Sequence, residues 1–326
     1  MMLCDYPIVF VAMEKLAEGQ PSFAITFPLN PDSLIESIKT VGIINPPVVR
    51  QKSNTDGFDI ILGLRRITAF KALGHATIPC RVIPEKDLSD LDSIMLNLHD
   101  NLTMRILNPI EKGMALALLL RHVSRQDILA DYMQLLGLPR HEPALNLHLS
   151  IANELSEDIK LGIAAERISM QAASEMLSMD PDTRETVYHL ITYLRLNVNY
   201  QIQFIELLID ISKRDSITIP ELTRNRDLSS LINDSDLSRP QKTRKVMEFL
   251  RDIRNPRLAQ AEKVFRKALS SINLTDGDTI VAPSFYESPY RELRLRFRTR
   301  KELKEKLQKI SDMEGIDDLI EPWKKR

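Results

Sequence analysis

The chain has 326 residues, a formal net charge of −1 at pH 7 and 43% hydrophobic residues. The length allows two or three domains of about 100–200 residues, and the apolar content excludes a disordered chain. Two cysteines, Cys4 and Cys80, are too few for a disulfide framework, which favours a reducing compartment. The longest apolar run, residues 114–120, is far shorter than the roughly 20 residues that cross a bilayer. We therefore expect a cytoplasmic protein without a membrane partner.

Strand and helix signals alternate over the first hundred residues. Asn30 as cap, Pro31 at the first helical position and Gly42 as the stop predict a helix. The β-type runs at residues 46–50 and 58–62 flank a polar turn and predict a hairpin. The other expected elements are a first strand within residues 1–16, a helix over 64–73 and a strand over 78–83. This pattern indicates a small α+β or α/β domain.

The sequence becomes almost continuously helical from Asn108. Asn108 precedes Pro109, and Glu111 follows three residues after the cap, which is the spacing of a capping box. Further helices are expected over residues 124–137, 142–154, 169–178, 182–195 and 199–213. Short helices at this density indicate a helix-turn-helix assembly or a simple bundle.

The last third has a different pattern. Residues 223–244 are polar and weakly periodic, which predicts a linker. A helix over 256–269, strands over 278–286 and 291–299, and a final helix over 301–310 are expected beyond it. The predicted fold is α+β and multidomain: an α/β domain at 1–106, an all-helical domain at 107–225, a linker at 226–255 and a ββα-type unit at 256–326.

The stretch Gly63-Leu64-Arg65-Arg66 lies where a strand meets a helix. A helix amino terminus offers unpaired backbone N–H groups, and glycine lets an oxyanion approach them closely. Two arginines in the first turn oppose the helix dipole by a few tenths of a kcal/mol each. A phosphate or carboxylate would remove that conflict, because guanidinium groups bind such oxygens in bidentate geometry. Solvated arginines on a surface helix are the alternative.

Three ordered stretches, "SIKTVGIINPPVVR", "GLRRITAFKALGHATIPCRVI" and "HDNLTMRILNPIEKGMALALLL", resemble the amino-terminal domain of the ParB family of DNA partition proteins. The resemblance covers residues 34–120. It implies that the first motif borders the cytosine of CTP, that Gly-x-Arg-Arg holds the triphosphate, and that the third motif contributes to phosphate and Mg²⁺ binding. The implied nucleotide-binding residues are Gly42, Ile43, Asn45, Pro46, Gly63, Arg65, Arg66, Asp100, Asn101 and Arg105, with Asp100 as the metal ligand.

Three positions depart from the family pattern. Leu64 and Asp100 stand where the family usually has glutamate, and Met104 replaces the usual arginine, with Arg105 next to it. Fewer or shorter carboxylates weaken a Mg²⁺ site, so weak CTP hydrolysis is left open. Three functions follow: a CTP-switched partition protein, a ParB-related transcription or accessory factor that has lost switching, or a phosphotransfer enzyme. No thiol neighbours residues 63–66, which argues against the related sulfiredoxin activity.

ParB proteins carry a helix-turn-helix after this domain, and the resemblance places its recognition helix at residues 143–153. The candidate DNA contacts are Arg140, His141, Asn146 and His148. Arginine and asparagine commonly read base edges. Leu145, Leu147 and Leu149 crowd the same segment, so a helix buried in a bundle is the alternative.

In the last predicted strand Arg294, Arg296 and Arg298 alternate with apolar residues, so a period of two puts the arginines on one face. They are candidate DNA contacts, and a solvated outer face of a small sheet is the alternative. The terminal helix, two strands and helix also resemble the ParB dimerisation unit. The resemblance implies a homodimer on the nucleoid, with DNA and a ParA-type partition ATPase as partners.

Overall fold

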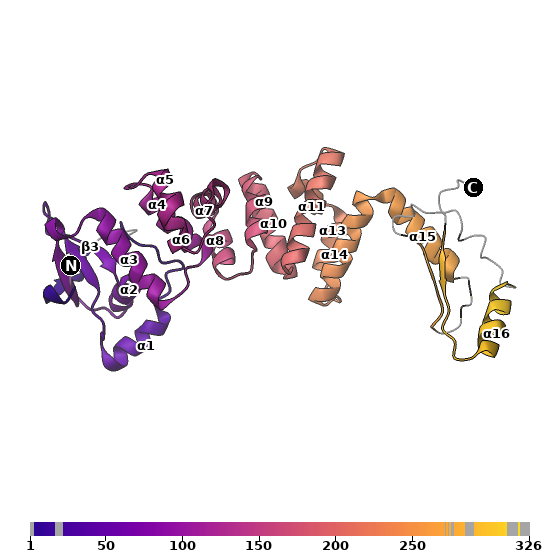
Figure 1. Cartoon of the computed structure of the whole chain (residues 1–326), viewed down its shortest axis with the longest axis horizontal. Coiled ribbons are helices and arrows are strands. Elements are labelled where there is room, and N and C mark those ends of the chain that lie inside the picture. The colour runs from indigo at the N-terminus through magenta and orange to yellow at the C-terminus, as the bar shows by residue number, and fades with distance from the viewer. Residues whose placement is uncertain are drawn as a thin grey trace. The chain divides into compact units, whose positions relative to one another are not determined.

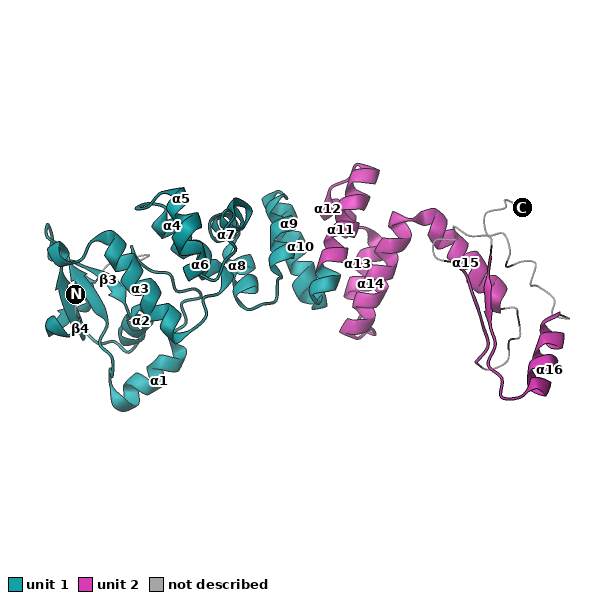
Figure 2. Cartoon of the chain, in the orientation of Figure 1, with its two compact units in different colours: residues 1–201 teal, residues 202–326 magenta. Residues whose placement is uncertain are grey.

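The computed structural model describes residues 3–16, 22–270, 272, 274, 277–283, 290–311 and 319. The chain forms two compact units, residues 1–201 and residues 202–326 (Figure 2). Among the described helices, none combines the length and apolar character needed to cross a membrane.

Unit 1 begins with a four-stranded sheet in the order β1-β4-β2-β3. Its strands are β1 (Ile8–Ala12), β2 (Val48–Gln51), β3 (Phe58–Leu62) and β4 (Thr77–Pro84). Strands β2 and β3 form the predicted hairpin, β4 runs parallel to β2, and β1 pairs only with β4. Single 3₁₀ turns lie at η1 (Leu3–Asp5), η2 (Met13–Lys15) and η3 (Glu85–Asp87). Strand β1 is therefore an edge strand.

Three helices accompany the sheet: α1 (Asp32–Val41), α2 (Leu64–Ala72) and α3 (Asp90–Met104) (Figure 1). Helix α1 begins one residue later than predicted, with Pro31 at the N-cap position and Asn30 Oδ1 accepting from the Asp32 amide at 2.8 Å. Gly42 ends the helix with φ 75°, as predicted. Sequence analysis had no prediction for α3, which begins at the cap Ser89. One apolar cluster joins the sheet to Ile67 of α2, and a second contains Leu98 of α3.

Helix α4 (Pro109–Leu119) begins with the predicted capping box between Asn108 and Glu111. The helices that follow are α5 (Arg125–Asp127), the π-helical turn η4 (Ile128–Tyr132), α6 (Met133–Leu135), α7 (Glu142–Glu154), α8 (Glu157–Ala164), α9 (Met170–Leu177) and α10 (Pro181–Leu194). The cluster that contains Leu98 continues into α4 through Leu116 and into α7 through Leu145. The sheet domain and the first helices of unit 1 thus share one core.

The unit boundary falls within α11 (Val198–Asp215). Unit 2 continues with α12 (Ile219–Thr223), α13 (Arg226–Asn233), α14 (Arg239–Arg254), α15 (Pro256–Ser270), β5 (Thr279–Val281), β6 (Glu292–Arg294) and α16 (Arg300–Ser311). The segment expected to be a linker is helical: α13 buries Leu228, and α14 buries Val246, Met247 and Leu250. Its polarity reflects the exposed faces of these helices.

The terminal ribbon is shorter than expected. Strands β5 and β6 pair antiparallel over three residues each, with Ile280 opposite Leu293. The expected strand over residues 291–299 ends at Arg294, and most of the rest of the expected strand over 278–286 lies outside the described residues.

Candidate functional site

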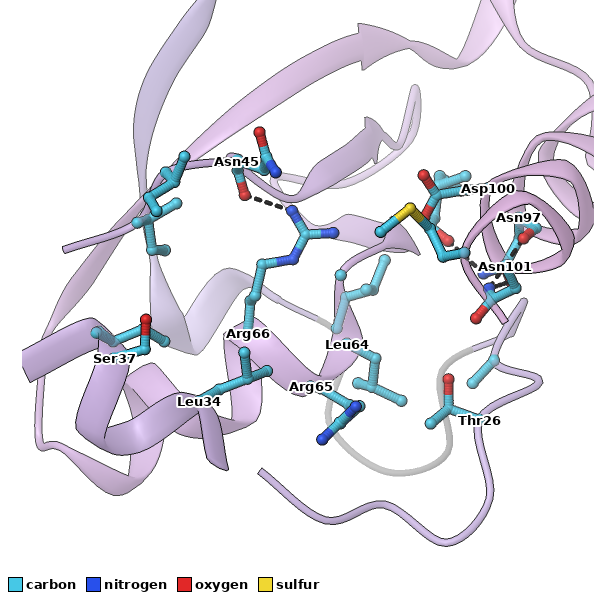
Figure 3. A pocket seen from close by; sticks show the side chains of 18 of the residues that line it. Thr26, Leu34, Ser37, Asn45, Leu64, Arg65, Arg66, Asn97, Asp100 and Asn101 are labelled. Atoms are coloured by element: carbon cyan, nitrogen blue, oxygen red, sulfur yellow. Dashed lines mark hydrogen bonds between the residues drawn. The ribbon is translucent and has the colours of Figure 1, made fainter. Parts of the chain in front are cut away.

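A cavity of about 370 Å³ lies beside α1, α2 and α3 in unit 1 (Figure 3). Three segments that are far apart in the sequence line it: residues 42–45, residues 63–66 and residues 97–105. They belong to the three motifs from which sequence analysis predicted a nucleotide site. The lining residues outside these segments include Ala24, Thr26, Leu34, Ser37, Ile38, Ile60 and Ile61.

Gly63 connects β3 to α2 in a conformation that disfavours other residues. Its φ is 87°, in the left-handed region that L side chains rarely adopt. A Cβ at this position would lie 3.0 Å from Arg66 Nε and 3.1 Å from Pro47 Cβ. Glycine therefore allows both the left-handed turn and the close contact of the Arg66 side chain with residue 63. At this point the first amides of α2 have no partner within the helix.

Hydrogen bonds to neighbouring segments position the two arginines. Arg65 donates from Nε to Asn30 O at 2.9 Å and from Nη2 to Ser33 Oγ at 3.2 Å. Arg66 donates from Nη1 to Asn45 O, as the dashed line in Figure 3 shows. Burial lowers the pKa of the Arg66 guanidinium, and the nearby Asp100 carboxylate opposes that change. Arginine stays charged at neutral pH even so, and the cavity holds two fixed cations at a helix amino terminus.

Two side-chain amides of α3 form a chain of hydrogen bonds along one wall of the cavity. Asn97 donates to Ile61 O at the end of β3, and Asn101 donates to both Asn97 O and Asn97 Oδ1 at 2.9 Å. Arg105 then donates from Nη2 to Asn101 Oδ1 at 2.9 Å. Because Asn101 Oδ1 and Nδ2 are both engaged, this side chain is fixed in one orientation. Asn97 is a lining residue that sequence analysis missed.

Glu111 completes this network from α4. Its side chain is 2% exposed, and Oε2 accepts from Arg105 Nη1 at 2.5 Å and from the Asn108 amide at 3.0 Å. Its other oxygen accepts from the Phe27 amide at 3.0 Å, and Asn108 Nδ2 donates to Phe27 O at 2.6 Å. Glu111 was predicted only as a capping-box residue. The structure shows that it also joins Arg105 and the loop before α1 to α4.

Nearly all the predicted nucleotide-binding residues line the cavity. These are Gly42, Ile43, Asn45, Gly63, Arg65, Arg66, Asp100, Asn101 and Arg105, whereas Pro46 is not among the lining residues. Met104 and Arg105 both line the cavity, but only Arg105 brings a positive charge. Among the described lining residues, Asp100 is the single carboxylate, and Leu64 adds an apolar side chain. Mg²⁺ is usually held by one or two carboxylates together with substrate phosphates, so this donor set fits a metal that arrives with a nucleotide.

The proposed recognition helix corresponds to α7, which follows the positive-φ turn residue Gly137. Arg140 is exposed, and Asn146 is exposed and accepts from Arg125. His141 caps α7 by accepting from the Ala144 amide at 3.1 Å. His148 is 8% exposed, and its Nδ1 lies 2.9 Å from Ala144 O.

The burial of His148 corrects its prediction as a DNA contact. Its ring is enclosed on the face of α7 that packs against α4, where the close contact needs Gly113. The apolar residues of the segment explain the burial, because the same side of the helix buries Leu145 and Ile151.

The predicted row of terminal arginines is interrupted by the end of β6. Arg294 lies in β6 and pairs with Glu292 at 3.0 Å. The amide of Arg296 donates to Asp278 Oδ1 at 2.9 Å, and the amide of Arg298 donates to Glu302 Oε2 at 2.7 Å. All three arginines are exposed, but the strand geometry that would align them holds only for Arg294.

Comparison with known proteins identifies relatives of the part of the chain that contains the cavity. Residues 8–102 match the family model described as the ParB N-terminal domain. The chain is 34% identical over 156 residues to a nucleoid occlusion protein of Halalkalibacterium halodurans, covering 48% of this chain and 51% of that protein. It is 28% identical over 183 residues to a probable chromosome-partitioning protein ParB of Vibrio cholerae, covering 55% and 59%. The chain thus spans about half the length of the curated relatives it matches.

Among solved structures, a C-terminally truncated ParB from Caulobacter crescentus complexed with CTP-gamma-S aligns with 57% of this chain and 98% of that chain. The identity is 19% and the TM-score is 0.27, which is too low to establish a shared arrangement. The family model and the curated relatives support a ParB family protein in which residues 8–102 match the ParB N-terminal domain.

Proposed function

We propose that the chain is a DNA-binding protein of chromosome or plasmid partition whose conformation responds to CTP. The observation that carries this proposal is the convergence of residues 42–45, 63–66 and 97–105 on one cavity. Two arginines and a helix amino terminus suit the phosphates, while Ile43, Ile44 and Leu64 give part of the wall an apolar surface that suits a base.

In this mechanism the protein binds and orients the nucleotide. Arg65 and Arg66 hold phosphate oxygens together with the amides after Gly63, and Asp100 and Asn101 lie on the facing helix α3. Bound Mg²⁺ would neutralise phosphate charge and take Asp100 as a ligand. The proposal assigns binding and not turnover, because Asp100 is the one carboxylate among the described lining residues.

The network that ends at Glu111 gives the nucleotide a route to α4. Arg105 donates to Asn101 beside the cavity and to Glu111 in α4, and Glu111 also accepts from the Phe27 amide. A ligand that changes the position of Asn101 therefore changes the bonds that hold α4. A ligand shifts a conformational equilibrium only by its differential affinity for the two states, so these bonds must differ between the free and bound states.

The rest of the chain supplies the proposed DNA and dimer functions. Helices lie on both sides of the turn at Gly137 within residues 125–154, and Arg140 before α7 and Asn146 in α7 are exposed. The short β5–β6 ribbon with exposed Leu293, and exposed Phe297 just beyond it, support the proposed homodimer, because a two-stranded ribbon needs another apolar surface for stability. Binding to a ParA-type ATPase and a location on the nucleoid are parts of the same proposal.

A second candidate function is a ParB-related transcription or accessory factor that does not bind CTP. Leu64 favours it, because this residue puts an apolar side chain in the cavity where the family usually has a carboxylate. This candidate keeps the DNA-binding helices and predicts no response to any nucleotide.

Amide hydrogen exchange of the full chain tests the proposed coupling. CTP with Mg²⁺ should slow exchange at Phe27 and over residues 108–119 in the wild type and leave Arg65→Ala unchanged. Arg140→Ala is the matched control, because it removes an exposed arginine outside the cavity and should keep the nucleotide response. CTP binding without any change at these amides would refute the coupling, and an unaltered response of Arg65→Ala would refute the site.

A further inference from the structure

Arg125 connects the start of α5 to the first half of α7. Its Nε donates to Glu142 Oε2 at 2.8 Å and to Glu142 Oε1 at 3.1 Å, and its Nη2 lies 2.6 Å from Glu142 Oε2. The same Nη2 donates to Asn146 Oδ1. Glu142 and Asn146 are four residues apart in α7, so one guanidinium holds two side chains on the same face of the helix.

The bond to Arg125 determines the orientation of the Asn146 amide. A guanidinium carries only N–H donors, so the Asn146 atom that faces it must be the carbonyl oxygen. The Nδ2 group then keeps both of its donors, and no described residue accepts a hydrogen bond from it. Because Asn146 is exposed, the protein presents a hydrogen-bond donor of fixed orientation on the surface of α7.

This contact is not what holds α7 in place. Arg125 and Glu142 keep 42% and 48% of their side chains exposed, and exposed ion pairs contribute little to stability. An apolar cluster that contains Ile128, Met133 and Leu145 already joins the segment after Arg125 to α7. The effect of the Arg125 bonds is therefore local: they orient Asn146.

Asn146 lies in the part of α7 that would meet base edges. In a helix-turn-helix the second helix enters the major groove, and residues near its amino terminus contact the bases. Asn146 is the fifth residue of α7, and its side is opposite to the buried side that contains Leu145 and His148. Both purines present N7 as a hydrogen-bond acceptor in the major groove. A free Nδ2 donor is complementary to that atom.

We propose that Arg125 is a positioning residue for base recognition: it orients the Asn146 amide so that Nδ2 donates to N7 of a purine in the major groove. This inference rests on the proposed function, because it takes α7 as the recognition helix. Without Arg125 the amide can rotate, and either end of it can bond to water. The base opposite Asn146 is then read less strictly, although Asn146 itself is still present.

Selection of binding sites by the full chain, from a DNA duplex library with a randomised centre, tests the inference. The wild type should select a purine at one position, and Asn146→Ala identifies that position by losing the preference there. Arg125→Ala should lose most of the preference at the same position and keep the preferences elsewhere. The control is Arg244→Ala, which breaks the exposed Arg244–Glu248 pair at 3.2 Å in α14 and should keep every preference.

A duplex in which this purine carries C–H in place of N7 measures the contact directly. The replacement should weaken binding of the wild type about tenfold, and binding of Arg125→Ala less than about threefold. Uniformly weaker binding by Arg125→Ala, with the purine preference and the N7 dependence intact, would overturn the inference, because a phosphate contact gives that result.

The same selection separates this inference from the function on which it rests. If the wild type selects no sequence, the proposed DNA recognition is wrong and the inference is wrong with it. If the wild type selects a sequence and Asn146→Ala changes no position, the DNA-binding function stands and the role of Arg125 is refuted alone.

Discussion

Replacement of Glu111 by glutamine tests whether the buried carboxylate holds the ParB N-terminal domain to α4. Glu111 is 1% exposed and accepts from Phe27, Asn108 and Arg105. Glutamine keeps the shape, removes the charge and turns one acceptor into a donor that faces a donor. Since breaking a buried ion pair costs about 3–5 kcal/mol, we expect a loss of about 3 kcal/mol in the free energy of unfolding.

The assay is urea unfolding followed by far-ultraviolet circular dichroism, with amide exchange at Phe27 as the local measurement. The matched control is Glu36→Gln, which breaks the exposed Glu36–Lys39 pair at 3.2 Å and should cost less than about 0.5 kcal/mol. Equal, small losses for both variants would refute the reasoning. Unchanged protection of the Phe27 amide in Glu111→Gln would refute the assigned hydrogen bond.

Three further predictions concern the core of unit 1. Gly113→Ala would put a Cβ 2.1 Å from His148 O, a contact that forces α4 and α7 apart. Helix propensity favours alanine by only about 1 kcal/mol, so we expect a net loss of about 2 kcal/mol in the free energy of unfolding, measured in urea. A gain in stability would contradict the α4–α7 contact. Arg50→Met removes the buried ion pair with Asp59 at 3.0 Å and leaves Asp59 only the pair with Lys52 at 3.3 Å, so it should cost about 2 kcal/mol. A neutral result in the same assay would show that the Arg50–Asp59 pair is dispensable. Burial raises the pKa of the Cys80 thiol from 9.0 to about 12, so the thiol loses its proton at a lower pH in the unfolded state than in the folded state. The free energy of unfolding should therefore fall as pH rises above 9, by about 1 kcal/mol at pH 10. The wild type should lose that stability in unfolding titrations between pH 8 and pH 10 and Cys80→Ala should not, whereas identical pH profiles would contradict the shift.

Local sequence signals predicted much of unit 1 because they act over a few residues. The hairpin of β2 and β3, the glycine at the end of α1 and the capping box at Asn108 depend on turn and cap chemistry that is visible in the sequence. Helices α13 and α14 fall within the expected linker, and they were not predicted because polar residues on their exposed faces outnumber the few apolar residues that they bury.

The residues of the cavity were predictable from the sequence, but the hydrogen bonds that connect them to one another and to α4 were not. Gly63, Arg65 and Arg66 stand out because their chemistry conflicts with an isolated helix, and the family resemblance added the other two motifs. The second role of Glu111 depends on the loop at Phe27, 84 residues earlier, and no local pattern encodes that contact. The burial of His148 similarly depends on which face of α7 meets α4.

The end of β6 at Arg294 was not predictable from the residue pattern of that strand. Alternation of arginine with apolar residues predicted a strand through residue 299, yet the ladder lasts for only three residues opposite β5. Period-two alternation is compatible with a strand but does not supply a partner, and a strand ends where its hydrogen-bonded neighbour ends.

The central claim is that the cavity of the ParB N-terminal domain binds CTP. The most direct measurement is a calorimetric titration of the full chain with CTP and Mg²⁺, with ATP, GTP and UTP as comparisons and Arg65→Ala and Arg140→Ala as variants. We expect binding that is selective for CTP, lost in Arg65→Ala and kept in Arg140→Ala. If the folded protein binds no nucleotide in the presence of DNA, the cavity is not a CTP site and the accessory factor is favoured, with Leu64 as the cause to test next.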